Sequence, residues 1–197
     1  MKSFELGQVP YLGEGWSDFL EILKITPVMD YTHITHELAR NRDTFKNLLF
    51  GLPNEVYLWK PQPDKWCLLE ILCHLIDEEC EDFRARVKHT LETPTAPMPP
   101  FDPVGLVMAR QYLQQDYDVQ LRRFLAEREQ SVQWLQSLAS PNWDNAYLHP
   151  KLGPMTAKLF LTNWLAHDYL HLRQITRMKF DYLKIISGED LTYAGNW

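Results

Sequence analysis

The sequence predicts an all-α protein, a four-helix bundle with an additional N-terminal arm. Three observations lead to this class. Four long segments place apolar residues three and four positions apart, alternating strand-like patterns are scarce, and prolines gather in the connections between the segments. The length of 197 residues fits one domain with a substantial core. We expect residues 1–29 to form an arm packed on the bundle, and residues 30–197 to form the bundle and a C-terminal tail.

The first two predicted helices each have one apolar face. The first runs from about Asp30 to Phe50, and Gly51-Leu52-Pro53 ends it. The second runs from about Cys67 to Leu91, and Glu70 follows Cys67 at the spacing of a capping box. The expected inward positions are Ile34, Leu38, Phe45 and Leu48 in the first helix, and Leu69, Cys73, Ile76, Cys80, Phe83 and Val87 in the second.

The third and fourth predicted helices run from about Val104 to Leu138 and from about Pro154 to Leu183. The inward positions of the third are Leu113, Tyr117, Leu121, Phe124, Val132 and Leu135, and those of the fourth are Phe160, Trp164, His167, His171, Ile175 and Met178. Loops rich in proline or glycine precede these helices, at Thr93–Pro103 and Ser140–Gly153. Four helices joined in this way favour a bundle.

Composition excludes several classes of function. The net charge is −6 and no basic stripe with interleaved aromatic residues occurs, so we expect no nucleic-acid partner. No apolar run approaches the length of a membrane span, and the first residues lack the apolar core of a signal peptide. We therefore expect no membrane association and, by default, a cytoplasmic protein. The three cysteines, Cys67, Cys73 and Cys80, fit a reducing compartment and are interpreted as small buried hydrophobes.

The most informative motif is the pair His167 and His171 in the fourth predicted helix. Residues four positions apart lie on one face of a helix, so both imidazoles can hold one metal ion. Chance alone gives about a quarter of one such pair in a chain with this many histidines, so the spacing is weak by itself. Two core histidines bonded to backbone or carboxylate groups are the alternative.

His74 strengthens the metal hypothesis because it lies near the apolar face of the second predicted helix, with acidic residues within one turn. One turn further on, Glu78 can orient a ligating histidine or act as a general base on metal-bound water. For any single member of this acidic run, which comprises Asp77, Glu78, Glu79, Glu81 and Asp82, a solvated acidic face is the favoured interpretation. His33 and His36 are interpreted as parts of a solvated first turn.

Two segments about ninety residues apart resemble the signatures of the DinB-like (DinB/YfiT) superfamily. Trp66–Leu75 is similar to its "W-S-x-x-E-x-x-x-H-L" pattern, with Cys67 where serine is usual. His167–Ile175 is similar to its closing "H-D-x-x-H-x-x-Q-I" pattern. The resemblance covers roughly residues 31 to 180 and implies a four-helix bundle that binds a divalent metal, nickel or zinc, through His74, His167 and His171.

The resemblance also implies a homodimer and chemistry on a small molecule. The first hypothesis is a metal-dependent S-transferase or isomerase that joins a low-molecular-weight thiol to an electrophile, with Glu78 as proton acceptor. Arg128 or Arg173 would position an anionic group, and His149, in a loop near the expected open end of the site, is a candidate substrate contact, with an ordinary loop-surface position as the alternative. The alternatives are a metal-dependent hydrolase and a non-catalytic bundle that binds a metal or a small molecule. A structural metal would need a fourth protein ligand, and the sequence suggests none besides Glu78 or Asp77.

Overall fold

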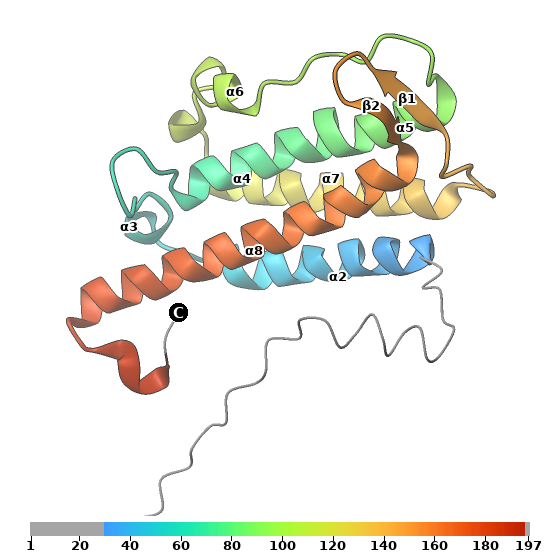
Figure 1. The fold of residues 1–197 in the computed structure, drawn as a ribbon. Helices are drawn as coiled ribbons and strands as arrows, with labels where there is room; N and C mark the ends of the chain where they lie inside the picture. The colour runs from blue at the N-terminus through green and yellow to red at the C-terminus, as the bar shows by residue number, and fades with distance from the viewer. Residues whose placement is uncertain (1–29, 196–197) are drawn as a thin grey trace, which may run out of the picture. The chain divides into compact units, whose positions relative to one another are not determined.

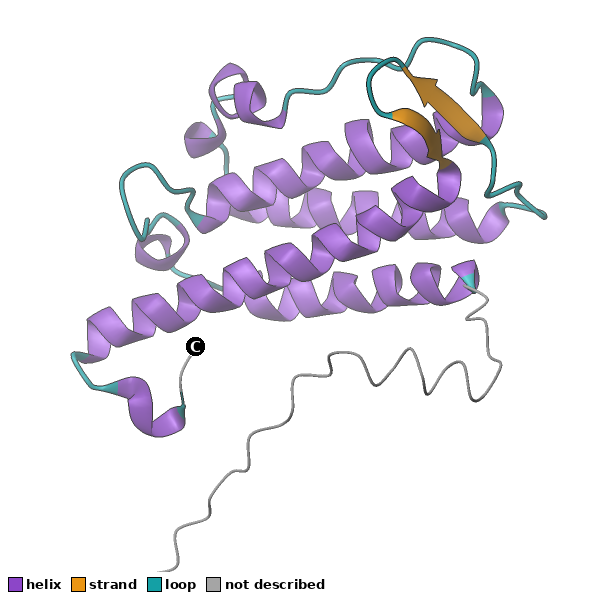
Figure 2. Ribbon diagram, viewed as in Figure 1, coloured by secondary structure: helices purple, strands orange, loops and turns teal. Residues whose placement is uncertain are grey.

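A four-helix bundle forms the body of the computed structural model, which describes residues 30–195 (Figures 1 and 2). Its helices are α2 (Tyr31–Leu49), the continuous run of α4 (Leu68–Asp77), η1 (Glu78–Phe83) and α5 (Arg84–Glu92), α7 (Tyr117–Ser137) and α8 (Ala157–Ser187). Shorter elements connect or follow them: α3 (Asn54–Tyr57), α6 (Pro103–Ala109), η2 (Tyr112–Gln114), β1 (Ala146–His149), β2 (Gly153–Thr156) and η3 (Leu191–Ala194). The predicted arm, residues 1–29, lies outside the described residues. The predicted fold class is confirmed.

The order of the helices around the bundle differs from their order in the sequence. α2 packs against α7 and α8, and the α4–η1–α5 run also packs against α7 and α8. The first two bundle helices therefore lie diagonally across from each other, as Figure 1 shows. α8 lies between the α4–η1–α5 run and α2, so its inward face can meet side chains from both.

Side-chain caps define where three of the bundle helices begin. The Glu70 carboxylate accepts the Cys67 N–H at 2.9 Å, which confirms the predicted capping box at the start of α4. Lys60 adds an ion pair to the same carboxylate at 2.7 Å. Asp116 caps α7 and Thr156 caps α8, each accepting a backbone N–H three residues ahead.

The second predicted helix is not regular, because η1 is a π-helical segment. A π-turn holds more residues than an α-turn and so rotates the helix face that follows it. As a result Glu79 is 1% exposed at the position of the core face, while Cys80, which we expected there, is only partly buried. The expectation of a solvated acidic face is wrong for Asp77, Glu78 and Glu79, all of which are buried.

The third predicted helix begins later than expected. Residues 103–116 form α6 and η2 rather than the first turns of α7, and Gln111 between them has a left-handed φ of 49°. The break places Tyr112 where its hydroxyl donates to Asp77 at 2.5 Å, beside an ion pair from Arg110 to the same carboxylate. Leu113, expected to face inward, is 50% exposed. A tertiary contact thus interrupts the helix, although the apolar spacing in the sequence continues through this segment.

A β-hairpin precedes α8 where the sequence predicted only loop and helix. β1 pairs antiparallel with β2, and His149 is paired with Gly153 across a three-residue turn. Gly153 has φ +77°, a conformation that glycine adopts without strain. The hairpin contacts both α5 and α8 and covers one end of the bundle (Figure 2). α8 therefore starts at Ala157 rather than at Pro154.

A polar layer crosses the core between two apolar clusters. One cluster holds the α4 residues up to Ile76 together with Ile175 and Met178 of α8, and the other holds Phe83 and the first turns of α8. Between them each bundle helix places one buried polar side chain at a similar level, and these are Asn41, Glu79, Arg128 and Asp168. The ligand candidates His74 and His171 are buried at this level of α4 and α8.

None of the described helices combines the length and apolar character that a membrane crossing requires.

Candidate metal centre

The three histidines predicted to bind a metal lie together in the bundle. His74 comes from α4, and His167 and His171 come from consecutive turns of α8. One nitrogen of each ring lies within 4.8 Å of the others, and the Nε2 atoms of His167 and His171 are 3.1 Å apart. Metal–nitrogen bonds of about 2.0–2.1 Å place two ligand nitrogens roughly 2.9–3.4 Å apart, so this separation matches two ligands of one ion.

Burial keeps these histidines neutral. Desolvation, followed by the neighbouring His171, lowers the pKa of His74 to about 3 and that of His167 to about 3. Desolvation also lowers the pKa of His171. Neutral imidazole is the form that binds metal. At neutral pH each ring therefore has a free nitrogen, and a metal ion would not have to displace a proton from a charged imidazolium. Aromatic rings enclose the group, with Trp66 at 5.0 Å from the His74 ring and Phe83 at 5.0 Å from the His167 ring.

The facing nitrogens of the rings fit a bound cation. Nε2 of His167 and Nε2 of His171 lie 3.1 Å apart, and two nitrogens in this position can share at most one proton. A cation between the rings would accept the lone pairs of both, and a donor set of three imidazoles suits zinc, nickel, copper or iron. Among the described residues, Nδ1 of His171, on the other edge of its ring, and Nδ1 of His74 are buried without a hydrogen-bond partner.

Glu78 adds a carboxyl group beside the histidines, as the sequence predicted. Its Oε1 is 3.7 Å from His74 Nε2, and the residue is 7% exposed. Burial, followed by the nearby Asp82 carboxylate, raises the pKa of Glu78 to about 8. A carboxyl group with a pKa in this range can accept or release a proton near neutral pH.

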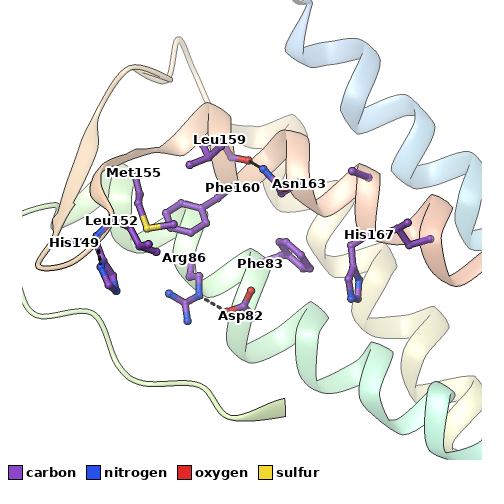
Figure 3. Close-up of a pocket in the computed structure, with 12 residues that line it drawn as sticks. Asp82, Phe83, Arg86, His149, Leu152, Met155, Leu159, Phe160, Asn163 and His167 are labelled. Carbon is purple, nitrogen blue, oxygen red and sulfur yellow. Dashed lines mark hydrogen bonds and ion pairs between the residues drawn. The ribbon is translucent and has the colours of Figure 1, made fainter. Parts of the chain in front are cut away.

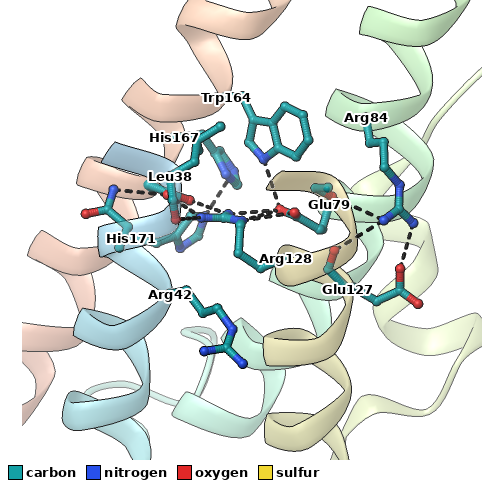
Figure 4. Close-up of polar contacts among 12 residues, drawn as sticks. Leu38, Arg42, Glu79, Arg84, Glu127, Arg128, Trp164, His167 and His171 are labelled. Carbon is teal, nitrogen blue, oxygen red and sulfur yellow. Dashed lines mark hydrogen bonds and ion pairs between the residues drawn. The ribbon is translucent and has the colours of Figure 1, made fainter. Parts of the chain in front are cut away.

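The structure gives Arg128 a different role from the predicted contact with a substrate. It is 1% exposed and forms ion pairs with Glu79 at 2.9 Å (Figure 4) and with Asp168 at 2.6 Å. Its remaining hydrogen bond is to the carbonyl oxygen of Leu38, at 3.3 Å. Because protein acceptors occupy the guanidinium on every side, it holds α8 to η1 and α7 rather than an anionic ligand.

Several members of this layer were not anticipated from the sequence. Glu79 also accepts the indole N–H of Trp164 at 2.9 Å, and Asp168 accepts from the amide of Asn41 at 3.0 Å. Asp168 follows His167 directly, so the same ion pair that buries Asp168 fixes this turn of α8. Asp168, which lies between His167 and His171, was the one sequence signal that could have pointed to this layer.

A cavity of about 610 Å³ meets the histidine group at His167. It runs beneath the hairpin and is lined by Asp82, Phe83, Arg86, His149, Leu152, Met155, Leu159, Phe160, Asn163, Ala166, His167 and Leu170 (Figure 3). His149, a predicted substrate contact, lies in its wall. Arg173, the other predicted contact, is exposed on α8 and does not line this cavity.

The cysteines take no visible part in the site. Burial raises the pKa of Cys67 to about 11 and that of Cys73 to about 12, so neither forms a thiolate readily. Cys80 is held in the same protonated state, because burial raises its pKa to about 12. These values agree with the interpretation of the thiols as small hydrophobes.

Comparison with known proteins gives the family. The model of the DinB superfamily matches residues 37–175, a span that includes all three histidines. The chain belongs to the DinB superfamily. Its fold is also similar to the solved structure of YfiT from Bacillus subtilis, with a TM-score of 0.67 and 16% sequence identity over 81% of this chain and 89% of that chain. YfiT is described as a probable metal-dependent hydrolase with an unusual four-helix bundle topology. The comparison with curated proteins gave no match.

Proposed function

We propose that this chain is a metal-dependent enzyme that hydrolyses a small molecule in the cavity beside His167. The observation that carries the proposal is the convergence of His74, His167 and His171, with one nitrogen of each within 4.8 Å of the others, at the end of that cavity. The description of the structurally similar YfiT as a probable metal-dependent hydrolase supports the same chemistry.

His74, His167 and His171 would hold a divalent ion, zinc or nickel, and leave coordination positions for other ligands. When bound, such an ion lowers the pKa of a coordinated water and polarises an acyl or related group. The ion pairs of Arg128 keep α8 in register with η1, so the histidines are held in place before substrate arrives.

Glu78 would accept and return the proton of the attacking group. Its carboxyl group lies 3.7 Å from His74 and is shielded from bulk water, so a proton placed on it stays within the site. A neighbouring cation favours the carboxylate form, which is the form that acts as a base.

Thiol transfer is the second candidate, and the size of the cavity favours keeping it. A volume of about 610 Å³ lies within the usual range for small-molecule pockets and has room for two small reactants. The Glu78 carboxylate can accept a proton from a thiol as well as from water. The chain's own cysteines, whose pKa values are raised, would not supply this thiol, so it would come from solution.

The first test is metal content, measured by plasma mass spectrometry on untagged protein beside H74A, H171A and the control H36A. His36 is exposed on α2, away from the histidine group. We expect about one zinc or nickel ion per chain in the wild type and in H36A, and loss of stoichiometric metal in the other two variants. Full metal in H74A and H171A, or none in the wild type after reconstitution, would refute the centre.

The second test separates hydrolysis from thiol transfer. The metal-loaded protein is assayed on a panel of aryl esters and amides without thiol, and on chlorodinitrobenzene with added cellular thiols. Hydrolysis without thiol that disappears in E78Q supports the first candidate, and turnover that requires the thiol supports the second. Stoichiometric metal with no turnover in either assay would favour a non-catalytic bundle.

A further inference from the structure

One wall of the cavity contains an arginine whose hydrogen-bonding capacity is only partly used. Arg86 on α5 pairs through Nε with Asp82, one turn earlier, and Nη1 lies 2.9 Å from the sulfur of Met98. Its side chain is 20% exposed, and its Cζ lies 5.8 Å from the centre of the Phe160 ring. A thioether sulfur is a weak acceptor, and in the described part of the chain Nη2 has no acceptor at all.

Arg128 of the same protein is an arginine in which every guanidinium nitrogen has an acceptor. Arg128 binds one carboxylate through Nε and Nη2 and a second through Nη1 and Nη2. Arg86 has one carboxylate partner, Asp82, which it meets through Nε. Where Arg128 has a second carboxylate, Arg86 has only the sulfur of Met98, near Nη1. The edge formed by Nη1 and Nη2 is therefore able to take a second carboxylate, and the pair with Asp82 does not prevent it.

A second donor lies in the same cavity wall. The Nδ1 atom of His149 accepts the backbone N–H groups of Lys151 and Leu152, each at 3.1 Å, within the hairpin turn. A ring nitrogen that accepts two N–H groups cannot itself hold the proton, so the proton of the neutral ring is on Nε2. The turn thus presents His149 as a hydrogen-bond donor.

The remaining surface of the cavity is mostly carbon, and besides the two histidines its other polar lining residues are Asp82, which pairs with Arg86, and Asn163, whose amide donates to the carbonyl of Leu159. Figure 3 shows Arg86 between His149 on one side and Phe83 and His167 on the other. Phe83 and Phe160 provide aromatic surface, and Leu152, Met155, Leu159 and Leu170 provide aliphatic surface. A ligand that fits has an apolar body and one acidic end, with its reacting group toward His167.

We propose that Arg86 and His149 form the binding subsite for a carboxylate of the substrate, which is a small apolar acid whose reactive group faces His167. The proposal rests on the proposed function for the orientation of the ligand, while the subsite itself is a binding property. It replaces Arg128 and Arg173 as the anchor of an anionic group. Binding would move Met98, in the loop between α5 and α6, away from the guanidinium edge.

The test compares a carboxylate with its uncharged counterpart. Binding of 4-phenylbutyrate and of 4-phenylbutanol is measured by calorimetry or ligand-detected NMR on the wild type, R86Q and R173Q, each with zinc and after chelation. The control Arg173 is an exposed arginine outside the cavity. We expect the wild type and R173Q to prefer the carboxylate, and R86Q to bind it about ten-fold or more weakly with the alcohol unchanged. H149F should lose part of the same preference.

Comparison of the zinc-loaded and the chelated protein distinguishes this subsite from direct binding of the carboxylate to the metal. A preference that survives chelation and disappears in R86Q supports the subsite even if no turnover is ever found. Carboxylate binding that disappears on chelation and persists in R86Q overturns it. If R86Q fails to fold because Asp82 loses its partner, the double variant D82N/R86Q removes both charges and gives the same comparison. A carboxylate preference in that folded double variant also overturns the proposal.

Discussion

At the scale of single residues, Glu78 shows how position changes chemistry. The acidic run on η1 looked like a solvated face, yet Glu78 is 7% exposed and faces His74 across 3.7 Å. Burial raises the pKa of Glu78 to about 8, while the same burial lowers the pKa of His74 to about 3. Both shifts have one cause, since a dry environment disfavours whichever form is charged. The metal-free site is therefore nearly uncharged.

This makes the stability of the metal-free protein depend on pH in a way that E78Q reveals. Between pH 4.5 and about 8 the folded state keeps a proton on Glu78 that the unfolded state has lost, so wild-type stability falls as pH rises. Glutamine does not titrate, so E78Q gains stability relative to the wild type across this window. Urea denaturation at several pH values in chelator measures the difference.

The histidines do not obscure this comparison. Because their pKa values are lowered, they cost stability in acid and that cost disappears as pH rises through 6.5, in both proteins alike. E92Q, which removes one exposed carboxylate at the end of α5, is the control for the change from glutamate to glutamine. A flat difference between E78Q and the wild type would mean that Glu78 is ionised in the fold.

At the scale of secondary-structure elements, the polar layer joins the helices that form the site. Arg128 of α7 binds Glu79 of η1 and Asp168 of α8, so one side chain connects three elements (Figure 4). The π-helical turn is what brings Glu79 to this face, since a regular α-helix would have placed Cys80 there. The geometry of His74 and His167 thus depends on residues that do not touch a metal.

Replacing Arg128, the cation shared by the two carboxylates, should lower the free energy of unfolding. In R128M the buried Glu79 and Asp168 would keep their bonds from Trp164 and Asn41 but lose their cation, and we expect a loss of about 3–5 kcal/mol in the free energy of unfolding. Urea denaturation of the metal-free protein at pH 7 measures it, with R122M on the exposed face of α7 as the control. A loss below about 1 kcal/mol would show that the layer relaxes without this arginine.

At the scale of the whole molecule, a metal ion would link α4 to α8, two long segments far apart in the sequence. The apolar clusters on either side of the polar layer do not include the three histidines, so they remain packed when the ion is removed. The bundle should therefore stay folded after chelation and be further stabilised by metal.

Zinc at about one hundred times its dissociation constant should add about 2.7 kcal/mol of stability, equivalent to roughly 5–10 °C in Tm for a chain of this size. Differential scanning calorimetry with and without chelator measures the shift, and H171A should show none of it. Cooperative unfolding on chelation at room temperature would instead indicate a structural metal. The homodimer expected from the family resemblance stays a prediction, which light scattering on the same samples tests.

Local pattern in the sequence was sufficient for the existence of the four helices and for the pair His167 and His171. The apolar period of α2 and of α8 persists over several turns, and the spacing of His167 and His171 is a property of one helix, so neither depends on distant contacts. The capping box at Cys67 and Glu70 is likewise local. The resemblance of two separate motifs to one family then joined His74 to the pair.

Tertiary structure decided what no local pattern contains. The π-turn at Glu78–Phe83 and the break at Gln111 each interrupt a plausible period, because buried polar contacts between distant segments outweigh helix propensity at those places. The hairpin before α8 lies where the sequence predicted mainly a loop. Arg128 was expected to meet a ligand and instead meets Glu79 and Asp168, and Arg86 occupies the cavity. Which of several arginines faces the cavity depends on how the helices pack against one another, and that packing is a property of the whole fold.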